Sequence, residues 1–553
     1  MSSSFSSRSS HPQVRPPSGG YRLVRARPGP VAPPELDARQ RAVVDHPGGP
    51  LLVLAGPGTG KTTTLVEAVA ERVRRGGDPE RVLVLTFSRK AAVELRDRMA
   101  ARLGAGATGP QATTFHSYCY ALVRAHQDAD LFADPLRLLS GPEQDVAVRE
   151  LLAGQAELER AGRGGVRWPD ELRACLTTRG FADEVRAVLA RSRELGLGPG
   201  ALGDFARRTG RPDWGAAAAF LAEYLDVLDA RGVLDYAELV HRAVLLAERP
   251  ETAAELAARY DAVYVDEYQD TDAAQLRLLR ALAGDGRTLV AFGDPDQSIY
   301  AFRGGDVNGI LDFPDAFPRT DGSPAPVEVL TTSRRSGADL LAATRLITRR
   351  MPLTRLPAAA VRAHRDLAAV RPGGRVDALT FPTPGAELDN IADILRRAHL
   401  EDGVPWTDMA VLVRAGARSL PGVRRALTSA GVPVEVDGDD IPLRHEPAVG
   451  PLLTALRAAA EAALGEREGA EGAEGGEGAE GEEGEEGEEG AYGPGDALPS
   501  GAVPEAEGGG SDAASPDAAS PDVETALTLL ASPLGGMDAA DLRRLGRALR
   551  EEE

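Results

Sequence analysis

The chain has 553 residues, of which 42% are hydrophobic and 27% are charged, and its formal net charge is −21. This composition is typical of a globular protein with several domains and excludes a fibrous one. No apolar run approaches the roughly 20 residues that cross a bilayer, so we expect no membrane partner.

The cysteine count and the charge distribution narrow the class further. Cys119 and Cys175 are too few for a disulfide framework or a four-cysteine iron–sulfur cluster, so a cytoplasmic location is expected. Residues 466–489 hold twelve Glu and one Arg, a net charge of −11, which leaves −10 for the rest of the chain. Such a modestly acidic body binds a polyanion only through a local basic groove.

The first predicted elements are a disordered arm and an α/β core. Residues 1–20 are rich in Ser, Pro and Gly and lack the apolar region of a secretory signal. From 21 to 118, short apolar runs such as "GPLLVLAG" and "RVLVLTF" alternate with helical stretches, which predicts βαβ units and a parallel sheet. From 119 to 254, Ala, Leu, Arg and Glu recur with helical spacing and predict an all-helical insertion.

Strand patterns then return along the chain. The runs "YDAVYVDE" and "RTLVAFGD" predict that residues 255–325 complete the first α/β core. Residues 326–464 contain "GRVDALTF", "DMAVLVRAG" and "VPVEVDG", which predict a second, partial parallel-sheet core. Residues 465–522 are low-complexity and predict an acidic linker, and 523–553 resume an amphipathic helical pattern. Because that last pattern is short, we expect the N-terminal portion of a longer protein.

The stretch "AGPGTGKTT" lies between a predicted strand and a predicted helix. A glycine-rich turn in this position wraps backbone N–H groups around phosphates at a helix N-terminus. Lys61 is one of only two lysines among 63 basic residues, and a compact ammonium reaches the β and γ phosphates better than a planar guanidinium. Thr62 would give its hydroxyl to Mg²⁺. The expected nucleotide-binding residues of the loop are Gly56, Pro57, Gly58, Thr59, Gly60, Lys61, Thr62 and Thr63.

The run "VYVDEYQDT" predicts the second half of the same site. Asp266 and Glu267 end a buried strand, and the carboxyl ends of parallel strands are where open α/β folds bind ligands. Asp266 would hold Mg²⁺ through water, and Glu267 would orient and deprotonate the attacking water. Together with the lysine loop, this pair predicts an NTPase that uses ATP and Mg²⁺.

Several strings in order resemble a known motif set. "LDARQRAVV", "TFSRKAAVELRDR", "TTFHS", "VDEYQDT" and "FGDPDQSIYAFRGG" resemble superfamily 1 DNA helicases of the UvrD/Rep/PcrA type. The resemblance covers residues 36–118 and 232–336 and, more weakly, 370–460, and is strongest to motor subunits of actinobacterial AdnAB-type helicase–nucleases. It implies RecA-like cores and a DNA-dependent ATPase with 3′-to-5′ helicase or translocase activity in repair or recombination.

The resemblance also implies roles for individual residues. Gln40 is similar to a glutamine that reads adenine, Gln297 to a γ-phosphate sensor, and Arg335 to an arginine that the second core contributes to the γ-phosphate. Aromatic rings stack on any base and so grip single-stranded DNA without reading its sequence. The positions similar to single-strand contacts are Phe87, His116, Tyr300, Phe302 and Arg303.

Departures from the family pattern leave a non-motor function open beside the helicase. Ser333, Arg334, Thr63 and Phe302 replace an asparagine, an adenine-stacking aromatic, an arginine and a tryptophan, so base selectivity is not fixed by the pattern. The last two helicase strings and a nuclease motif are absent after residue 340. The alternative is therefore a nucleotide- and DNA-binding non-motor subunit that assembles with a nuclease-bearing partner. A P-loop kinase or GTPase is disfavoured because the loop around Tyr300 would have no role there.

Overall fold

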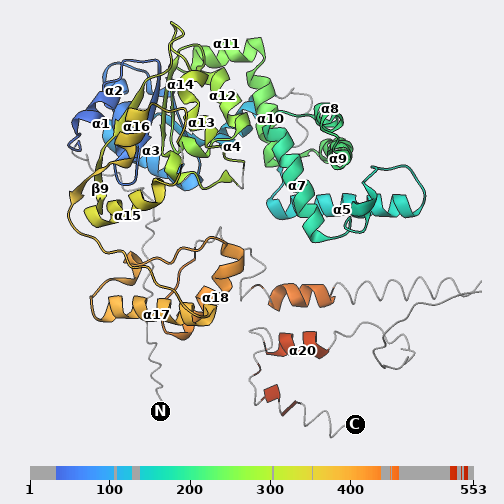
Figure 1. The fold of residues 1–553 in the computed structure, drawn as a ribbon. Helices are drawn as coiled ribbons and strands as arrows, with labels where there is room; N and C mark the ends of the chain where they lie inside the picture. Colours follow the sequence, from blue (N-terminus) through green and yellow to red (C-terminus); the bar gives the residue numbers. More distant parts are fainter. Residues whose placement is uncertain are drawn as a thin grey trace, which may run out of the picture. The chain divides into compact units, whose positions relative to one another are not determined.

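The computed structural model describes residues 33–104, 109–126, 137–301, 304–351, 353–436, 451–459 and 523–531, and positions 449, 537, 541, 542, 544 and 545. The chain divides into two compact units, residues 1–377 and 378–553 (Figure 1). The arm expected at 1–20 and the linker expected at 465–522 lie outside the described residues. Within the described part, no helix is both long and apolar enough to cross a membrane.

A six-stranded sheet forms the centre of the first unit, in the order β3-β2-β6-β7-β1-β8, with every neighbouring pair parallel. The strands are β1 (Pro50–Ala55), β2 (Val82–Thr86), β3 (Gln111–Thr114), β6 (Ala262–Val265), β7 (Thr288–Gly293) and β8 (Val327–Leu330). This sheet confirms the predicted α/β class. Because β8 pairs with β1, the sheet extends past the boundary that was expected after residue 325.

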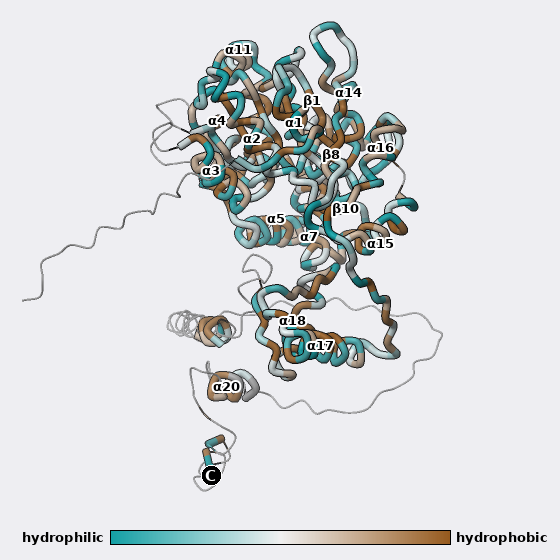
Figure 2. Tube along the Cα trace, turned by 90° about the vertical axis from the view of Figure 1, so that its left-hand side faces the viewer, coloured by the Kyte–Doolittle hydropathy of each residue, from teal (hydrophilic) through white to brown (hydrophobic). Residues whose placement is uncertain are grey.

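The central strands β1, β2, β6 and β7 are nearly continuous apolar runs because helices cover both faces of the sheet. In β1, Leu52 and Leu54 join one buried cluster, whereas Val53 and Ala55 join the other. The hydrophobic stretches accordingly gather around β1 and β8 (Figure 2). The first cluster includes residues of α4 (Phe115–Ala125), α10 (Tyr236–Ala247) and α12 (Ala273–Ala283), and the second includes residues of α1 (Ala38–Val44), α2 (Lys61–Arg74) and α3 (Arg89–Leu103).

The segment between β3 and β6 is mostly helical and has a core of its own, around Trp168, Phe220 and Tyr224. Its further helices are α5 (Gly141–Arg160), α6 (Asp170–Arg173), α7 (Arg179–Glu194), α8 (Pro199–Thr209), α9 (Pro212–Ala230) and α11 (Pro250–Arg259). A two-residue parallel ladder joins β4 (Arg137–Leu138) to β5 (Val233–Leu234), so the segment is not all-helical as predicted. The ladder pairs the backbone on either side of the helices, where Leu139 N donates to Leu234 O.

A small second sheet follows β8 in the first unit. It pairs β9 (Thr332–Gly337) with β10 (Ala368–Arg371) in parallel, and α15 (Ala338–Thr348) and α16 (Ala358–Arg365) connect the two strands. Short helical elements complete the unit: η1 (Pro79–Arg81), η3 (Tyr268–Asp270), η4 (Pro295–Gln297), α13 (Asn308–Leu311) and α14 (Phe313–Ala316).

The described part of the second unit has helices but no sheet. These include α17 (Pro384–Leu400), η6 (Trp406–Asp408), α18 (Gly416–Ser429), a helical stretch at 451–459 and α20 (Val523–Leu530). Helix α17 packs on α18 through Ala392, Val423 and Leu427. The strands predicted from "GRVDALTF", "DMAVLVRAG" and "VPVEVDG" are wrong for the described residues. An apolar run becomes a strand only when another strand takes its backbone N–H and C=O groups. No strand in the described part of the chain pairs with these runs, and Leu412 is 92% exposed.

Candidate active site

The glycine-rich loop joins β1 to α2, as its sequence predicts. Thr59 Oγ1 donates to Gly56 O at 2.7 Å and closes the loop on itself. Gly58 and Gly60 have φ values of 72° and 84°, a left-handed conformation that glycine adopts without steric cost. Lys61 is the first residue of α2, so the loop places its ammonium at a helix N-terminus, where anions bind.

Strand β9 lies directly against this loop. Ser333 Oγ donates to Pro57 O at 2.8 Å, and Arg334 N donates to Gly58 O at 2.8 Å. A Cβ atom on Gly58 would lie 2.7 Å from Arg335 Cβ, so only glycine allows this approach. The contact brings Arg335 to the edge of the phosphate loop from a strand more than 270 residues along the chain.

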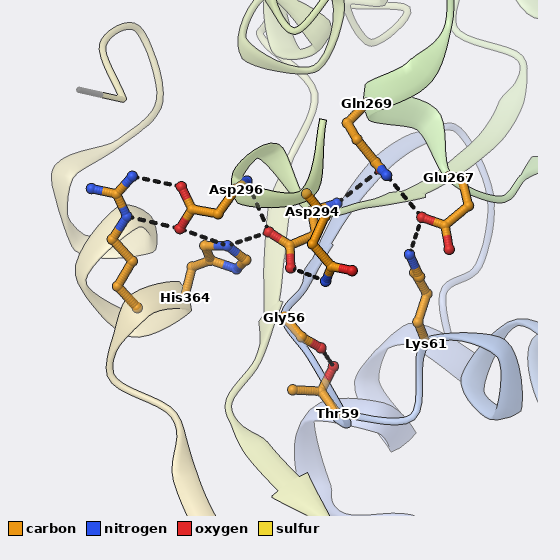
Figure 3. Close-up of polar contacts among 10 residues, drawn as sticks. Gly56, Thr59, Lys61, Glu267, Gln269, Asp294, Asp296 and His364 are labelled. Atoms are coloured by element: carbon orange, nitrogen blue, oxygen red, sulfur yellow. Dashed lines mark hydrogen bonds and ion pairs between the residues drawn. The ribbon is translucent and has the colours of Figure 1, made fainter. Parts of the chain in front are cut away.

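Two carboxylates follow β6 on the same side of the sheet. Lys61 Nζ forms an ion pair with Glu267 Oε2, which also accepts from Gln269 Nε2 at 2.8 Å (Figure 3). Glu267 has φ 52°, a strained value for a non-glycine residue that is typical of functional sites. Burial raises the pKa of Asp266 to about 6, and the neighbouring charge of Glu267 adds to this, whereas Lys61 opposes it.

The groups line two adjoining cavities. A space of about 510 Å³, within the range of small-ligand pockets, is lined by the whole loop and by cations and polar groups from other elements. An adjoining space of about 370 Å³ contains Asp266 and shares Thr62, Glu267 and Gln297 with the first. The predicted residues that line the larger space are Gly56, Pro57, Gly58, Thr59, Gly60, Lys61, Thr62, Thr63, Glu267, Gln297 and Arg335.

Gln40 is placed differently from its expected role in adenine reading. Its side-chain amide donates to Thr59 O at 3.1 Å and accepts from Asp37 N at 3.1 Å, and the residue is 3% exposed. Asp37 accepts from Gln40 N in return, which completes a capping box at the start of α1. In this structure the carboxamide therefore holds the phosphate loop rather than facing the cavity.

Three cavity arginines were not predicted as nucleotide contacts. Arg98 of α3, Arg334 of β9 and Arg371 of β10 all line the larger space. Arg334 Nη2 donates to Asp37 Oδ2 at 2.8 Å, where an adenine-stacking aromatic was expected by resemblance. In a chain so rich in arginine, no local signal distinguishes Arg98 or Arg371 from surface residues.

Three of the expected DNA-contacting residues, Phe87, His116 and Tyr300, line spaces beside this cavity. The rings of Phe87 and Tyr300 are 4.4 Å apart and share the 370 Å³ space. Phe87 and His116 also line a cleft of about 820 Å³, where His116 meets Tyr236 edge-on at 5.4 Å. Tyr236 was missed because its only sequence signal is its place after a helix cap. Phe302 and Arg303 lie outside the described residues.

The 820 Å³ cleft is acidic rather than basic. Its walls carry Glu194, Asp270, Asp272 and Asp306, with Arg191 as the one lining cation of the described residues. Burial raises the pKa of Asp270 and of Asp272 to about 6 and raises the pKa of Glu194 as well. Such walls repel phosphates, so the cleft suits stacked bases better than a sugar–phosphate backbone.

Comparison with known proteins places the sequence in a family. The sequence matches the model of the UvrD/REP helicase N-terminal domain over residues 36–318, just over half of the chain. The chain belongs to the UvrD/REP helicase family. Those residues include the loop of Lys61, the pair Asp266 and Glu267, and Gln297. The predicted UvrD type is thus confirmed, whereas the finer resemblance to AdnAB-type subunits stays a prediction.

Named relatives within the UvrD group are similar over different lengths. The chain is 32% identical to ATP-dependent DNA helicase UvrD2 of Mycobacterium tuberculosis, over 73% of this chain and 55% of the relative. It is 30% identical to UvrD1 of Mycobacterium leprae, over 73% and 50%, and 31% identical to DNA helicase II of Escherichia coli, over 51% and 36%. The matches therefore span about half or less of the relatives' own length.

Proposed function

We propose that the protein is a DNA-dependent ATPase that moves along single-stranded DNA as a helicase or translocase of the UvrD type, 3′ to 5′, in repair or recombination. One observation carries the proposal: Lys61 and Glu267 form an ion pair inside a cavity that Gln297 and Arg335 also line. A P-loop cation, a carboxylate base and a polar sensor around one cavity are the parts of a nucleoside triphosphatase.

The ion pair supports a definite sequence of events. A triphosphate brings several negative charges to Lys61, and these outcompete the single carboxylate of Glu267. Glu267 is then free to accept a proton from the attacking water, and Arg335 of β9 lies close enough to the loop to stabilise charge on the leaving phosphates. Substrate binding thus creates the base that hydrolysis needs.

The residues also fit the divalent ion that this chemistry requires. The Thr62 hydroxyl and the Asp266 carboxylate belong to the adjoining 370 Å³ space and are hard oxygen ligands of the kind Mg²⁺ prefers. Bound Mg²⁺ would neutralise phosphate charge. Asp266 would hold the ion through water and must be ionised to do so, whereas burial raises its pKa and opposes this.

DNA binding would affect the nucleotide site because the two sites share the residues that line the 370 Å³ space. Phe87 and Tyr300 line the space that Glu267 and Gln297 also line, so a base inserted at the rings changes the surroundings of the sensor. Alternating grip of these rings on successive bases, timed by hydrolysis, would give translocation.

The test is phosphate release from ATP with and without single-stranded DNA. We expect DNA to stimulate release and Glu267→Gln to abolish it, while Glu251→Gln, an exposed glutamate on α11, leaves it unchanged. Nucleotide binding without release by the wild-type protein would favour the alternative, a non-motor nucleotide- and DNA-binding subunit. A nuclease-bearing partner and a cytoplasmic location stay predictions of the sequence.

A further inference from the structure

Helix α16 meets the phosphate site from the side opposite Glu267 (Figure 3). A Cβ atom on Gly56 would lie 2.8 Å from Leu367 Cδ1 and 3.6 Å from His364 Cε1, so the end of this helix touches the start of the loop. His364 is 3% exposed and its neighbour Arg365 is half-buried. Neither residue has a role in the proposed hydrolysis.

His364 is bonded to the loop that carries the sensor. Its Nε2 lies 3.0 Å from Asp294 Oδ1, and the other oxygen of Asp294 accepts from Gln297 Nε2 at 2.5 Å. Asp294 N donates to Gln269 Oε1, and Gln269 Nε2 donates to Glu267. A continuous chain of hydrogen bonds therefore runs from His364 through the sensor loop to the carboxylate that pairs with Lys61.

The direction of the hydrogen bond between His364 and Asp294 follows from their contacts. Asp294 is an acceptor, and despite burial its hydrogen bond to His364 holds its pKa below the ordinary value. His364 Nε2 must therefore carry a hydrogen and donate it, while Nδ1 has no partner among the described residues.

A metal ion is not the better explanation of this cluster. Asp294, Asp296 and His364 offer ligand atoms within 4.8 Å of one another. However, Arg365 already donates to both oxygens of Asp296, at 2.6 and 3.0 Å. Both oxygens of Asp294 are occupied as well, by His364 and Asp296 N on one side and Gln297 on the other. The carboxylate oxygens of Asp294 and Asp296 therefore already have donors, and the hydrogen bonds hold these side chains in fixed orientations.

We propose that His364 is a positioning residue for the γ-phosphate sensor. By holding Oδ1 of Asp294 it turns Oδ2 toward Gln297, which fixes one of the two hydrogens on Gln297 Nε2 and leaves the second for a phosphate oxygen. Without His364, the buried Asp294 carboxylate rotates toward other donors and the amide loses its orientation. This inference rests on the proposed nucleotide cavity but concerns how the cavity distinguishes three phosphates from two.

The experiment compares equilibrium binding of fluorescent ADP and of a fluorescent non-hydrolysable ATP analogue, with Mg²⁺, to the full chain. Gln297→Ala should lower the preference for the triphosphate by about 3- to 10-fold, the value of one hydrogen bond. His364→Ala should lower it by a similar factor, and the double variant by no more than either single one. His364→Gln, which keeps a donor, should restore most of the preference, and Arg362→Ala, an exposed change on the same helix, should not alter it.

The outcomes distinguish the positioning role of His364 from the proposed ATPase function. A wild-type preference in His364→Ala, or losses that multiply in the double variant, would overturn the inference alone. A wild-type protein that prefers the triphosphate but never hydrolyses it would overturn the proposed function alone, and no preference in the wild type would overturn both. If His364→Ala unfolds too early to assay, His364→Asn, whose amide is too short to reach Asp294, replaces it.

Discussion

The close approach of β9 to the phosphate loop makes Gly58→Ala an informative single change. At φ 72° an alanine costs about 1–2 kcal/mol of backbone strain. Its Cβ would also lie 2.7 Å from Arg335 Cβ and 2.8 Å from Ser333 Oγ, so β9 must move away. The movement breaks two hydrogen bonds to the loop, each worth about 0.5–1.5 kcal/mol. The expected destabilisation is therefore about 2–5 kcal/mol.

Gly76→Ala is the matched control for this prediction. Gly76 has φ 97° and follows the same helix, but its Cβ would meet nothing within 4 Å, so only the strain of about 1–2 kcal/mol remains. Urea unfolding would give the difference between the two variants, and trypsin cleavage at Arg334 and Arg335 would report the release of β9. Equal stability of the two variants, with unchanged cleavage at these arginines, would refute the contact between β9 and the loop.

Three further predictions concern the DNA rings, the buried acid and the capping glutamine. Phe87→Ala and Tyr300→Ala should each weaken single-stranded DNA binding by about 1–3 kcal/mol in fluorescence anisotropy; because the rings contact each other, the double variant should lose less than the sum, and full additivity would contradict this. Burial holds the pKa of Asp266 near 6 against an ordinary 3.8, so ionisation opposes folding. Without nucleotide or divalent ions, the protein should lose up to about 3 kcal/mol of stability as the pH rises from 4 to 6, a loss that Asp266→Asn should lessen in urea unfolding. Gln40→Ala should lower the free energy of unfolding by about 1–2 kcal/mol, because it removes the capping box and a hydrogen bond to the loop. It should change the preference for ATP over GTP by less than about threefold. A variant of full stability that has lost this preference would support the adenine-reading role instead.

The phosphate site could be predicted from the sequence because two general structural rules are enough to place its residues. A glycine-rich turn between strand and helix has one geometry, and strands of a parallel sheet present their carboxyl ends at one edge, which brings Lys61 and Glu267 together. The central strands of the sheet could also be predicted, because strands that are covered on both faces are continuous apolar runs. These signals are local, and the long-range contact follows from topology alone.

Other parts of the structure depend on partners that no local pattern specifies. The run of Val411 to Val413 has the composition of a strand, but strand formation depends on a neighbour elsewhere in the chain. His364 stands in "AAAVRAHR", which reads as an ordinary helix, and only the folded chain shows that it reaches Asp294. Gln40 resembles the adenine-reading glutamine of the family in sequence, yet its carboxamide is bonded to Thr59 O and Asp37 N of the protein itself.

These contacts share one property that bears on how the site works. Three groups predicted near the nucleotide, and Arg334 of the cavity wall, each have a protein partner in this structure: Lys61 with Glu267, Gln297 with Asp294, Gln40 with Thr59, and Arg334 with Asp37. A buried or half-buried charge that loses its partner is strongly destabilised, so a ligand must replace each partner that it displaces. Nucleotide binding is then an exchange of partners. We expect a triphosphate to compete with Glu267 for Lys61 and also to offer its γ-phosphate to Gln297, whereas a diphosphate has no third phosphate for Gln297 to contact.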